Sequence, residues 1–118
     1  MQLAIRFVVS VILLHFSLGE AHGATMTTSW YQTGHTTASG MPFNPNNPYI
    51  AAHKSLRFGT HLLLKNPANG RTLCVEIQDR GPFIKGRQLD ITRAGAKRLN
   101  FGQKGVVELA VVRSGCAK

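Results

Sequence analysis

The sequence predicts a small, mostly β domain that closes into a barrel and carries one short α-helix. Two observations predict this class. Short β-prone segments recur along the chain, and clusters of Gly, Pro and Asn separate them. A single helical segment with a capping Thr in front of it interrupts this pattern near the C-terminal end. About six short strands and one helix are typical of a closed or nearly closed small β-barrel, but they do not say which barrel.

The first half of the domain is predicted to hold three strands and one long loop. Residues 25–31 are rich in Thr and aromatic side chains and predict the first strand. Residues 32–48 are rich in Gly, Thr, Ser, Asn and Pro, and a loop of this length is typically functional or disordered. Residues 50–53 predict a short buried strand, and residues 61–65 predict a clearer one.

The second half begins with a predicted hairpin. Asn69 and Gly70 favour a tight turn into residues 71–77, whose alternating polarity is typical of a half-buried strand that leads to Asp79. Gly81-Pro82 then breaks this strand. The remaining predicted elements are a short strand over residues 89–91, a helix over residues 93–99 capped by Thr92, and a strand over residues 106–112.

Residues 1–23 predict a secretory signal peptide, which leaves residues 24–118 as one domain. Arg6 supplies the positive start, an apolar run follows to about Leu18, and Ala21-His22-Gly23 offers small residues before a cut. The alternative is an uncleaved membrane anchor, but the apolar run is shorter than the ~20 residues that a span needs. We therefore expect a periplasmic or secreted monomer without stable membrane insertion. Because no Cys lies near the cut, we expect no lipid anchor.

The chain is strongly basic, with 14 Lys and Arg against 5 Asp and Glu and a net charge of +9. Signal cleavage would remove Arg6 and Glu20 together, so the charge would persist. Such a surface attracts polyanions. We expect no nucleic-acid partner, because an exported protein seldom meets nucleic acid and the sequence has no basic stripe interleaved with aromatic residues. Anionic cell-wall polymers fit better, and the alternative is a solvated face that keeps the protein soluble.

Cys74 and Cys116 are the only cysteines, and export permits a disulfide. We expect a Cys74–Cys116 bridge that ties a central strand to the end of the chain. The alternative is a buried free thiol at Cys74 and an unpaired residue at Cys116. We expect no metal site and no cofactor, because the His residues lack the spacing of a zinc site and have no thiolate companions.

Asp79 is the first candidate for chemistry, because it stands where a predicted strand ends and a loop begins. The alternative is a carboxylate that bonds backbone amides in an Asx-type turn. Asp90 is either a barrel-stabilising carboxylate paired with Arg80 or Arg87, or a substrate contact. For His53, which follows an apolar run, the alternatives are a core histidine or a residue that orients Asp79 or binds sugar.

Eight sequence blocks occur in the order seen in the rare lipoprotein A family, and the chain resembles that family from about Thr28 to Val112. The blocks are Ser29-Trp30-Tyr31, Thr37-Ala38-Ser39-Gly40, Ala51-Ala52-His53-Lys54-Ser55-Leu56, Gly59-Thr60, Asn69-Gly70-Arg71, Asp79-Arg80-Gly81-Pro82-Phe83, Gly86-Arg87 and Leu89-Asp90-Ile91. The resemblance implies a mostly β, six-stranded double-psi β-barrel, shared with expansin and barwin domains. It also implies a lytic transglycosylase that acts on peptidoglycan strands stripped of their stem peptides.

The resemblance also implies site residues. The acidic residue of the Asp-Arg-Gly-Pro-Phe block corresponds to Asp79, and the His of the Ala-Ala-His block corresponds to His53. A family Glu follows the Thr-Ala-Ser-Gly block, but Met41 stands there in this chain. Many members also carry a lipid-anchoring Cys and a C-terminal glycan-binding repeat domain, and we expect neither in this protein. Met41 is the departure that bears on catalysis.

A lytic transglycosylase can use one carboxyl group, because the 6-hydroxyl of the muramic acid attacks the anomeric carbon and no water is activated. We expect Asp79 to act as acid and then as base, with a pKa raised by an apolar wall. The expected substrate-binding residues are Trp30, Tyr31, Thr37, Ser39, Arg80 and Asp90, although the aromatic pair also suits a core. The alternative function is a non-catalytic, expansin-like module that binds or loosens the wall. A lesser one is a secreted effector that acts on other organisms.

Overall fold

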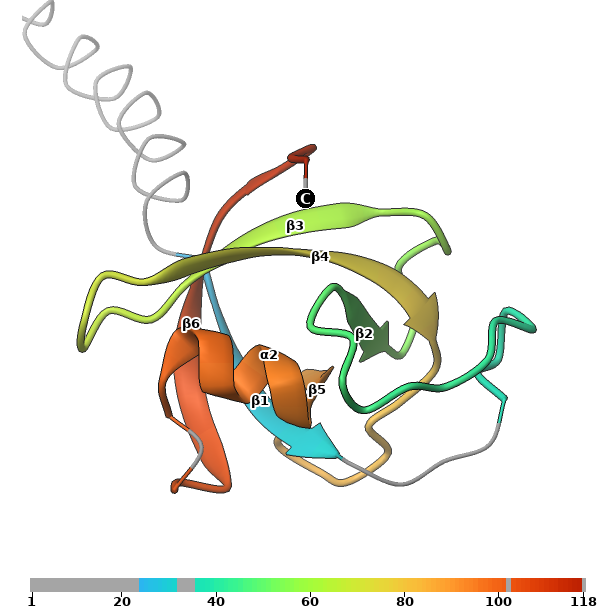
Figure 1. The fold of residues 1–118 in the computed structure, drawn as a ribbon, viewed down its shortest axis with the longest axis horizontal. Helices are drawn as coiled ribbons and strands as arrows, with labels where there is room; N and C mark the ends of the chain where they lie inside the picture. Colours follow the sequence, from blue (N-terminus) through green and yellow to red (C-terminus); the bar gives the residue numbers. More distant parts are fainter. Residues whose placement is uncertain (1–23, 32–35, 102, 118) are drawn as a thin grey trace, which may run out of the picture.

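The computed structural model describes residues 24–31, 36–101 and 103–117. Within these ranges the chain forms six strands and one helix (Figure 1). In chain order they are β1 (Thr25–Tyr31), β2 (Ile50–His53), β3 (His61–Lys65), β4 (Thr72–Asp79), β5 (Leu89–Thr92), α2 (Arg93–Leu99) and β6 (Val106–Ser114). Each strand predicted from the sequence is present, and the largest differences are that β4 and β6 each run two residues beyond their predicted ends.

The strands close into a barrel in the order β1-β5-β2-β4-β3-β6. The pairs β1/β5 and β2/β4 are parallel, and the other four neighbouring pairs are antiparallel. Because β5 lies between β1 and β2, segments far apart in the sequence are adjacent in the barrel. This mixed, closed sheet with one short helix confirms the predicted fold class.

The core fills the barrel interior with aliphatic side chains from alternate strand positions. Val75 and Ile77 of β4, Leu89 and Ile91 of β5, and Leu109 of β6 have no exposed surface. Since successive residues of a strand point to opposite faces, the residues between them face outward. On β5 this alternation turns Asp90 away from the core.

Helix α2 lies beside β1, β4 and β5, and it begins at the predicted cap (Figure 1). The Thr92 hydroxyl accepts the backbone N–H of Gly95 at 3.0 Å. At the other end Asn100 adopts a left-handed conformation, and its N–H bonds carbonyls of the last turn. The side-chain amides of Asn66 and Asn69 both donate to the Leu99 carbonyl oxygen. The helix is therefore satisfied at both ends by side chains of the barrel.

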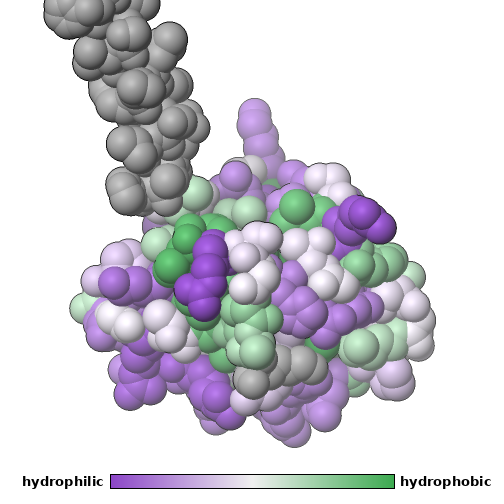
Figure 2. Space-filling view, turned by 90° about the horizontal axis from the view of Figure 1, so that it is seen from above, coloured by the Kyte–Doolittle hydropathy of each residue, from purple (hydrophilic) through white to green (hydrophobic). Residues whose placement is uncertain are grey.

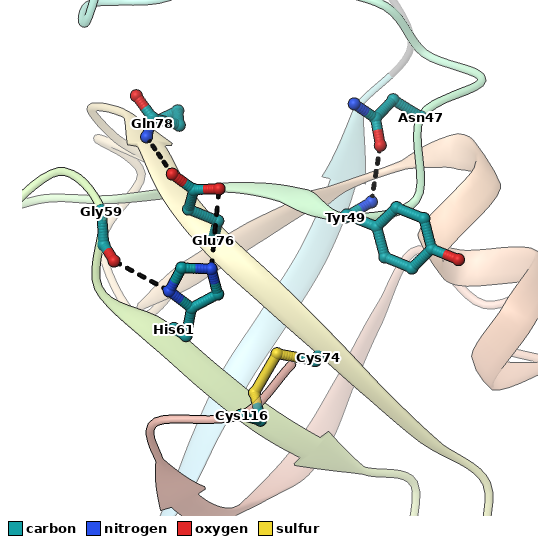
Figure 3. Close-up of polar contacts among 8 residues, drawn as sticks. All are labelled: Asn47, Tyr49, Gly59, His61, Cys74, Glu76, Gln78 and Cys116. Atoms are coloured by element: carbon teal, nitrogen blue, oxygen red, sulfur yellow. Dashed lines mark hydrogen bonds and ion pairs between the residues drawn. A yellow bond between two sulfur atoms is a disulfide. The ribbon is translucent and has the colours of Figure 1, made fainter. Parts of the chain in front are cut away.

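A disulfide joins Cys74 on β4 to Cys116 after β6, across 42 residues of sequence (Figure 3). On the same strand β4, the Glu76 carboxylate accepts the Gln78 amide and lies 3.6 Å from Nε2 of His61 on β3 (Figure 3). Ser114 is the last residue of β6 that pairs with β3, and the disulfide lies two residues further along the chain. The bridge pins the C-terminal segment to the central strand, as the two cysteines predicted.

The surface seen in Figure 2 is largely hydrophilic, with hydrophobic residues in small groups between the polar ones. Within the described ranges no helix is long and apolar enough to cross a membrane. The predicted signal peptide, residues 1–23, lies outside the described residues.

Candidate functional site

An open cleft of about 330 Å³ lies where β4 and β5 flank β2 and where β1 ends. It joins polar and apolar groups from both halves of the chain. Its lining residues are Tyr31, Thr36, Phe43, Ala52, Asp79, Arg80, Gly81, Pro82, Phe83, Ile84 and Asp90. The cleft therefore brings together four residues predicted from the sequence: Tyr31, Asp79, Arg80 and Asp90.

Asp79 reaches this cleft because of a bulge in β4. Ile77 pairs with Ala51, and both side chains are fully buried. The next pair joins Ala52 to Asp79, so Gln78 is the extra residue between them. Without the bulge, Asp79 would share the inward direction of Ile77. With it, Asp79 lies on the same side of the sheet as Ala52.

Asp90 stands on the opposite side of the same alanine. Ala52 pairs with Asp79 on β4 and with Asp90 on β5. Neighbouring strands lie about 4.8 Å apart, so the backbones of the two acidic residues are roughly 10 Å apart. The small side chain of Ala52 lies between the two acidic positions on the sheet, and the Tyr31 hydroxyl reaches Asp79 from β1. The register thus creates a pair of facing carboxylates.

The Asp79 carboxylate is held by donors on both oxygens. Its Oδ1 accepts the backbone N–H of Ala38 at 2.8 Å and of Arg80 at 2.9 Å. Its Oδ2 accepts the Tyr31 hydroxyl at a longer 3.5 Å. These hydrogen bonds fix the orientation of the carboxylate. The backbone-bonding role considered for Asp79 is therefore present, and it coexists with a place in the cleft.

The Asp90 carboxyl group has a different environment. Burial raises its pKa above the usual range, and the negative charge of Asp79 acts in the same direction. The Ser29 hydroxyl, which donates to Oδ1 at 2.8 Å, and the positive charge of Arg87 act against this rise in pKa. Burial therefore makes the Asp90 carboxyl group easier to protonate than a carboxyl group in water.

Tyr31 lies between the two acids at the end of β1. Burial, followed by the negative charges of Asp79 and Asp90, raises the pKa of the Tyr31 phenol. The phenol is therefore a neutral donor at any physiological pH. Its ring stacks on Phe43, with centroids 4.9 Å apart, so the long loop supplies an aromatic wall to the cleft.

Arg80 lines the cleft, but its guanidinium group is engaged with the protein itself. Nη1 donates to the carbonyl oxygen of Leu56 at 2.8 Å and to that of His53 at 3.2 Å. The guanidinium carbon also lies 4.0 Å from the centre of the Phe58 ring. Arg80 thus ties the β2–β3 connection to the end of β4, next to Asp79.

His53 ends β2 and organises the same connection. Its Nδ1 accepts the backbone N–H groups of Ser55 and Leu56, both at 3.1 Å, so Nδ1 carries no proton. Burial and the positive charges of Arg80 and Lys54 lower the pKa of His53. The side chain is a neutral cap of the turn and is not among the residues that line the cleft.

Thr37 and Ser39 belong to a tight turn in the long loop. The Thr37 hydroxyl donates to the Met41 carbonyl oxygen at 2.7 Å and lies 3.1 Å from the Ser39 hydroxyl. The Ser39 N–H donates to the Gln78 carbonyl oxygen at 3.2 Å, next to the bulge. This turn positions the Ala38 N–H against Asp79. Its polar groups bond within the protein, and neither Thr37 nor Ser39 lines the cleft.

Trp30 lies outside the cleft. It precedes Tyr31 on β1, so the two side chains leave the strand on opposite faces. Trp30 packs against the core and lines a separate pocket beside α2. Strand alternation is the signal that could have separated this aromatic pair.

Three residues of the site, Ser29, Phe43 and Ile84, were not predicted from the sequence. Ser29 bonds Asp90 and shares the outward face of β1 with Tyr31, which period-two alternation could have shown. Phe43 comes from a loop without periodicity. Ile84 is 55% exposed and Phe83 is 77% exposed, and both form an apolar rim on the cleft. Among the described residues, no group of three His, Cys, Asp or Glu side chains is placed to hold a metal ion.

The chain is similar to proteins that act on peptidoglycan. A family model described as lytic transglycolase matches residues 23–111. A probable endolytic peptidoglycan transglycosylase RlpA from Aquifex aeolicus is 47% identical over 92 residues, which cover 74% of this chain and 40% of that protein. An endolytic peptidoglycan transglycosylase RlpA from Pasteurella multocida is 44% identical over 78 residues, 66% of this chain and 26% of that protein. The chain spans less than half the length of these relatives.

Solved structures show the same fold. The Streptomyces papain inhibitor aligns with a TM-score of 0.59 at 22% identity, covering 78% of this chain and 97% of the inhibitor. A Clavibacter michiganensis expansin in complex with cellohexaose aligns with a TM-score of 0.56 at 21% identity, covering 80% of this chain and 54% of the expansin. At these identities the likeness establishes the barrel alone. The family itself is shown by the match to the family model and by the relatives, which confirm the resemblance found in the sequence. The chain belongs to the lytic transglycolase family, as an RlpA-like double-psi β-barrel domain.

Proposed function

We propose that this protein is an exported lytic transglycosylase that cleaves peptidoglycan glycan strands lacking stem peptides and leaves 1,6-anhydro-muramic ends. One observation carries the proposal. In a chain of this family, two carboxyl groups with different surroundings flank Ala52 on the floor of an open cleft. That arrangement suits a reaction in which one group must hold a proton while positive charge develops nearby.

In this proposal Asp90 is the proton donor, because it lines the cleft and burial raises its pKa. Asp90 protonates the glycosidic oxygen as the bond from that oxygen to the anomeric carbon breaks. The 6-hydroxyl of the same muramic residue then attacks the anomeric carbon, and its proton returns to the Asp90 carboxylate. The carboxyl group is thereby restored, and no water enters the reaction. The proposal gives Asp90 the acid role that the sequence predicted for Asp79, and it is supported by the raised pKa of Asp90 and by its place in the cleft.

Asp79 is then the second carboxyl group of the reaction. Its carboxylate faces the sugar and stabilises the positive charge of the oxocarbenium-like transition state. The backbone N–H groups of Ala38 and Arg80 fix its orientation, and Tyr31 donates a hydrogen bond to it. Arg80 and His53 act as positioning residues, because they build the connection against which Asp79 is held.

Met41 bears on how efficiently this site works. It stands where the resembling family has Glu, in the turn between Thr36 and Phe43, which both line the cleft. If a carboxylate at this position assists the reaction, Met41→Glu raises turnover. An unchanged rate shows that Asp79 and Asp90 suffice. Either result is informative only if Met41→Glu unfolds at the same urea concentration as the wild type.

The second candidate function is a non-catalytic module that binds or loosens the wall. Met41 and the net charge of +9 favour it, because a basic surface binds anionic wall polymers without any chemistry. Under this function Asp79→Asn and Asp90→Asn bind insoluble peptidoglycan as tightly as the wild type does. Neither variant releases products, and the wild type releases none either. We also propose that the protein works as a monomer in the periplasm or outside the cell.

The deciding experiment measures product release from peptide-free sacculi by the wild type, Asp90→Asn, Asp79→Asn and a control variant, Glu108→Gln. Glu108 is an exposed carboxylate on β6, away from the cleft. We expect Asp90→Asn to lower the rate by about 10²–10⁴-fold, as for loss of a general acid. Asp79→Asn lowers it by about 10²–10³-fold. Glu108→Gln leaves it unchanged, and a wild type without any turnover would contradict the proposal.

A further inference from the structure

A second pocket of about 330 Å³ lies between the end of β1 and helix α2, and it has no lining residue in common with the cleft. Its size is at the lower end of the range for small-molecule sites, roughly 300–1,000 Å³. Four of its residues fall at positions i, i+3, i+4 and i+7 along α2 and its cap, so they share one face of the helix. The full set is Trp30, Arg93, Ala96, Lys97, Asn100 and Gln103.

Trp30 gives this pocket an aromatic wall of fixed orientation. The indole N–H donates to the Lys104 carbonyl oxygen at 3.3 Å, and the ring is partly buried against the core. The polar edge of the indole is therefore satisfied within the protein. What the ring offers to the pocket is apolar surface, which suits the C–H face of a pyranose ring.

The helix adds positive charge to the same pocket. Arg93 and Lys97 are four residues apart, so their side chains are neighbours, and none of the six lining residues is acidic. The Arg93 guanidinium donates to the Asn46 side-chain oxygen at 2.6 Å, which fixes one cation beside the pocket. Two like charges at this spacing repel each other. An anion between them would relieve that repulsion.

We infer that this pocket binds a carboxylated sugar of the glycan strand, with the pyranose ring against Trp30 and the carboxylate beside Arg93 and Lys97. The inference rests on the proposed function for the identity of the polymer. A muramic residue without a stem peptide carries both features, a pyranose ring and a free lactyl carboxylate. The pocket thus gives the domain a second hold on the strand, outside the cleft, that selects peptide-free muramic residues.

Trp30 is the only tryptophan of the chain, so its fluorescence reports on this pocket. The test titrates the Asp90→Asn protein, which binds without turnover, with peptide-free muramic acid–glucosamine oligosaccharides. A chitin oligosaccharide of equal length, which lacks the lactyl carboxylate, serves as the matched probe. We expect a saturable fluorescence change with the muramic oligosaccharide and an affinity about three- to tenfold lower for the chitin probe, as for loss of one or two exposed charge contacts.

Charge variants then locate the contact. Arg93→Gln with Lys97→Gln should lower the affinity for the muramic probe to that of the chitin probe. The control double variant, Lys65→Gln with Arg113→Gln, removes the same charge from exposed positions outside the pocket and should leave affinity unchanged. Equal affinity for both probes, or equal losses in both double variants, would overturn the inference. The outcome is independent of the proposed catalysis, because product release is measured separately on the wild type.

Discussion

Replacing Arg80 tests whether this cation is a structural clamp or a substrate ligand. Its Nη1 donates to the carbonyl oxygens of Leu56 and His53 at 2.8 and 3.2 Å, and the guanidinium group stacks on Phe58 at 4.0 Å. A hydrogen bond from a charged donor contributes about 1.5–3 kcal/mol. The cation–π contact at a partly exposed site adds about 0.5–1 kcal/mol. Arg80→Met keeps the aliphatic stem, so we expect it to lower the free energy of unfolding by about 2–4 kcal/mol.

The assay is urea unfolding followed by tryptophan fluorescence and by far-ultraviolet circular dichroism, with the wild type and Arg113→Met measured in parallel. Arg113 lies exposed on β6, and its replacement should change the free energy of unfolding by no more than about 0.5 kcal/mol. If Arg80→Met also changes it by no more than about 0.5 kcal/mol, the clamp is refuted, and Arg80 is available to the substrate as the sequence predicted.

Three further predictions follow from the site and the barrel. Ser29→Ala removes the hydroxyl group that lowers the pKa of Asp90, so this pKa should rise further. The alkaline limb of the pH–rate profile should then move to higher pH, because the acid must be protonated to act. A limb that stays in place or moves to lower pH would contradict the acid role of Asp90. Replacing Cys74 and Cys116 by Ala opens a closure across 42 residues and should lower the free energy of unfolding by about 4 kcal/mol, measured in urea; a loss under about 1 kcal/mol would contradict the chain-entropy estimate. Phe83→Ala removes a ring that is 77% exposed on the cleft, so product release should fall at least about fivefold at unchanged stability; full activity would exclude Phe83 from sugar binding.

The fold was predictable because its signals are local. Thr92 before a short helical segment, the Asn69-Gly70 turn and the alternation along β4 each specify their element without reference to the rest of the chain. The end of β6 was less predictable, because its last residues pair with Leu62 and Leu63 of β3. That extension depends on tertiary pairing, which no local pattern reveals.

The site was predictable in its residues but not in their directions. Asp79 and Asp90 were identified from their motifs, yet period-two alternation turns Asp79 toward the core, and only the bulge at Gln78 returns it to the cleft. Trp30 and Tyr31 were grouped because they are adjacent, although adjacency on a strand sends them to opposite faces. The raised pKa of Asp90 depends on burial produced by the closed barrel, which no local sequence pattern reveals.

The central claim is that Asp90 and Asp79 cleave the glycan by an internal attack that uses no water. Digesting peptide-free sacculi in heavy-oxygen water, followed by mass analysis of the new muramic ends, tests it most directly. We predict 1,6-anhydro ends without heavy oxygen in the wild type, formed about 10²–10⁴-fold more slowly with Asp90→Asn. Reducing muramic ends that carry heavy oxygen would show hydrolysis instead and would contradict the account.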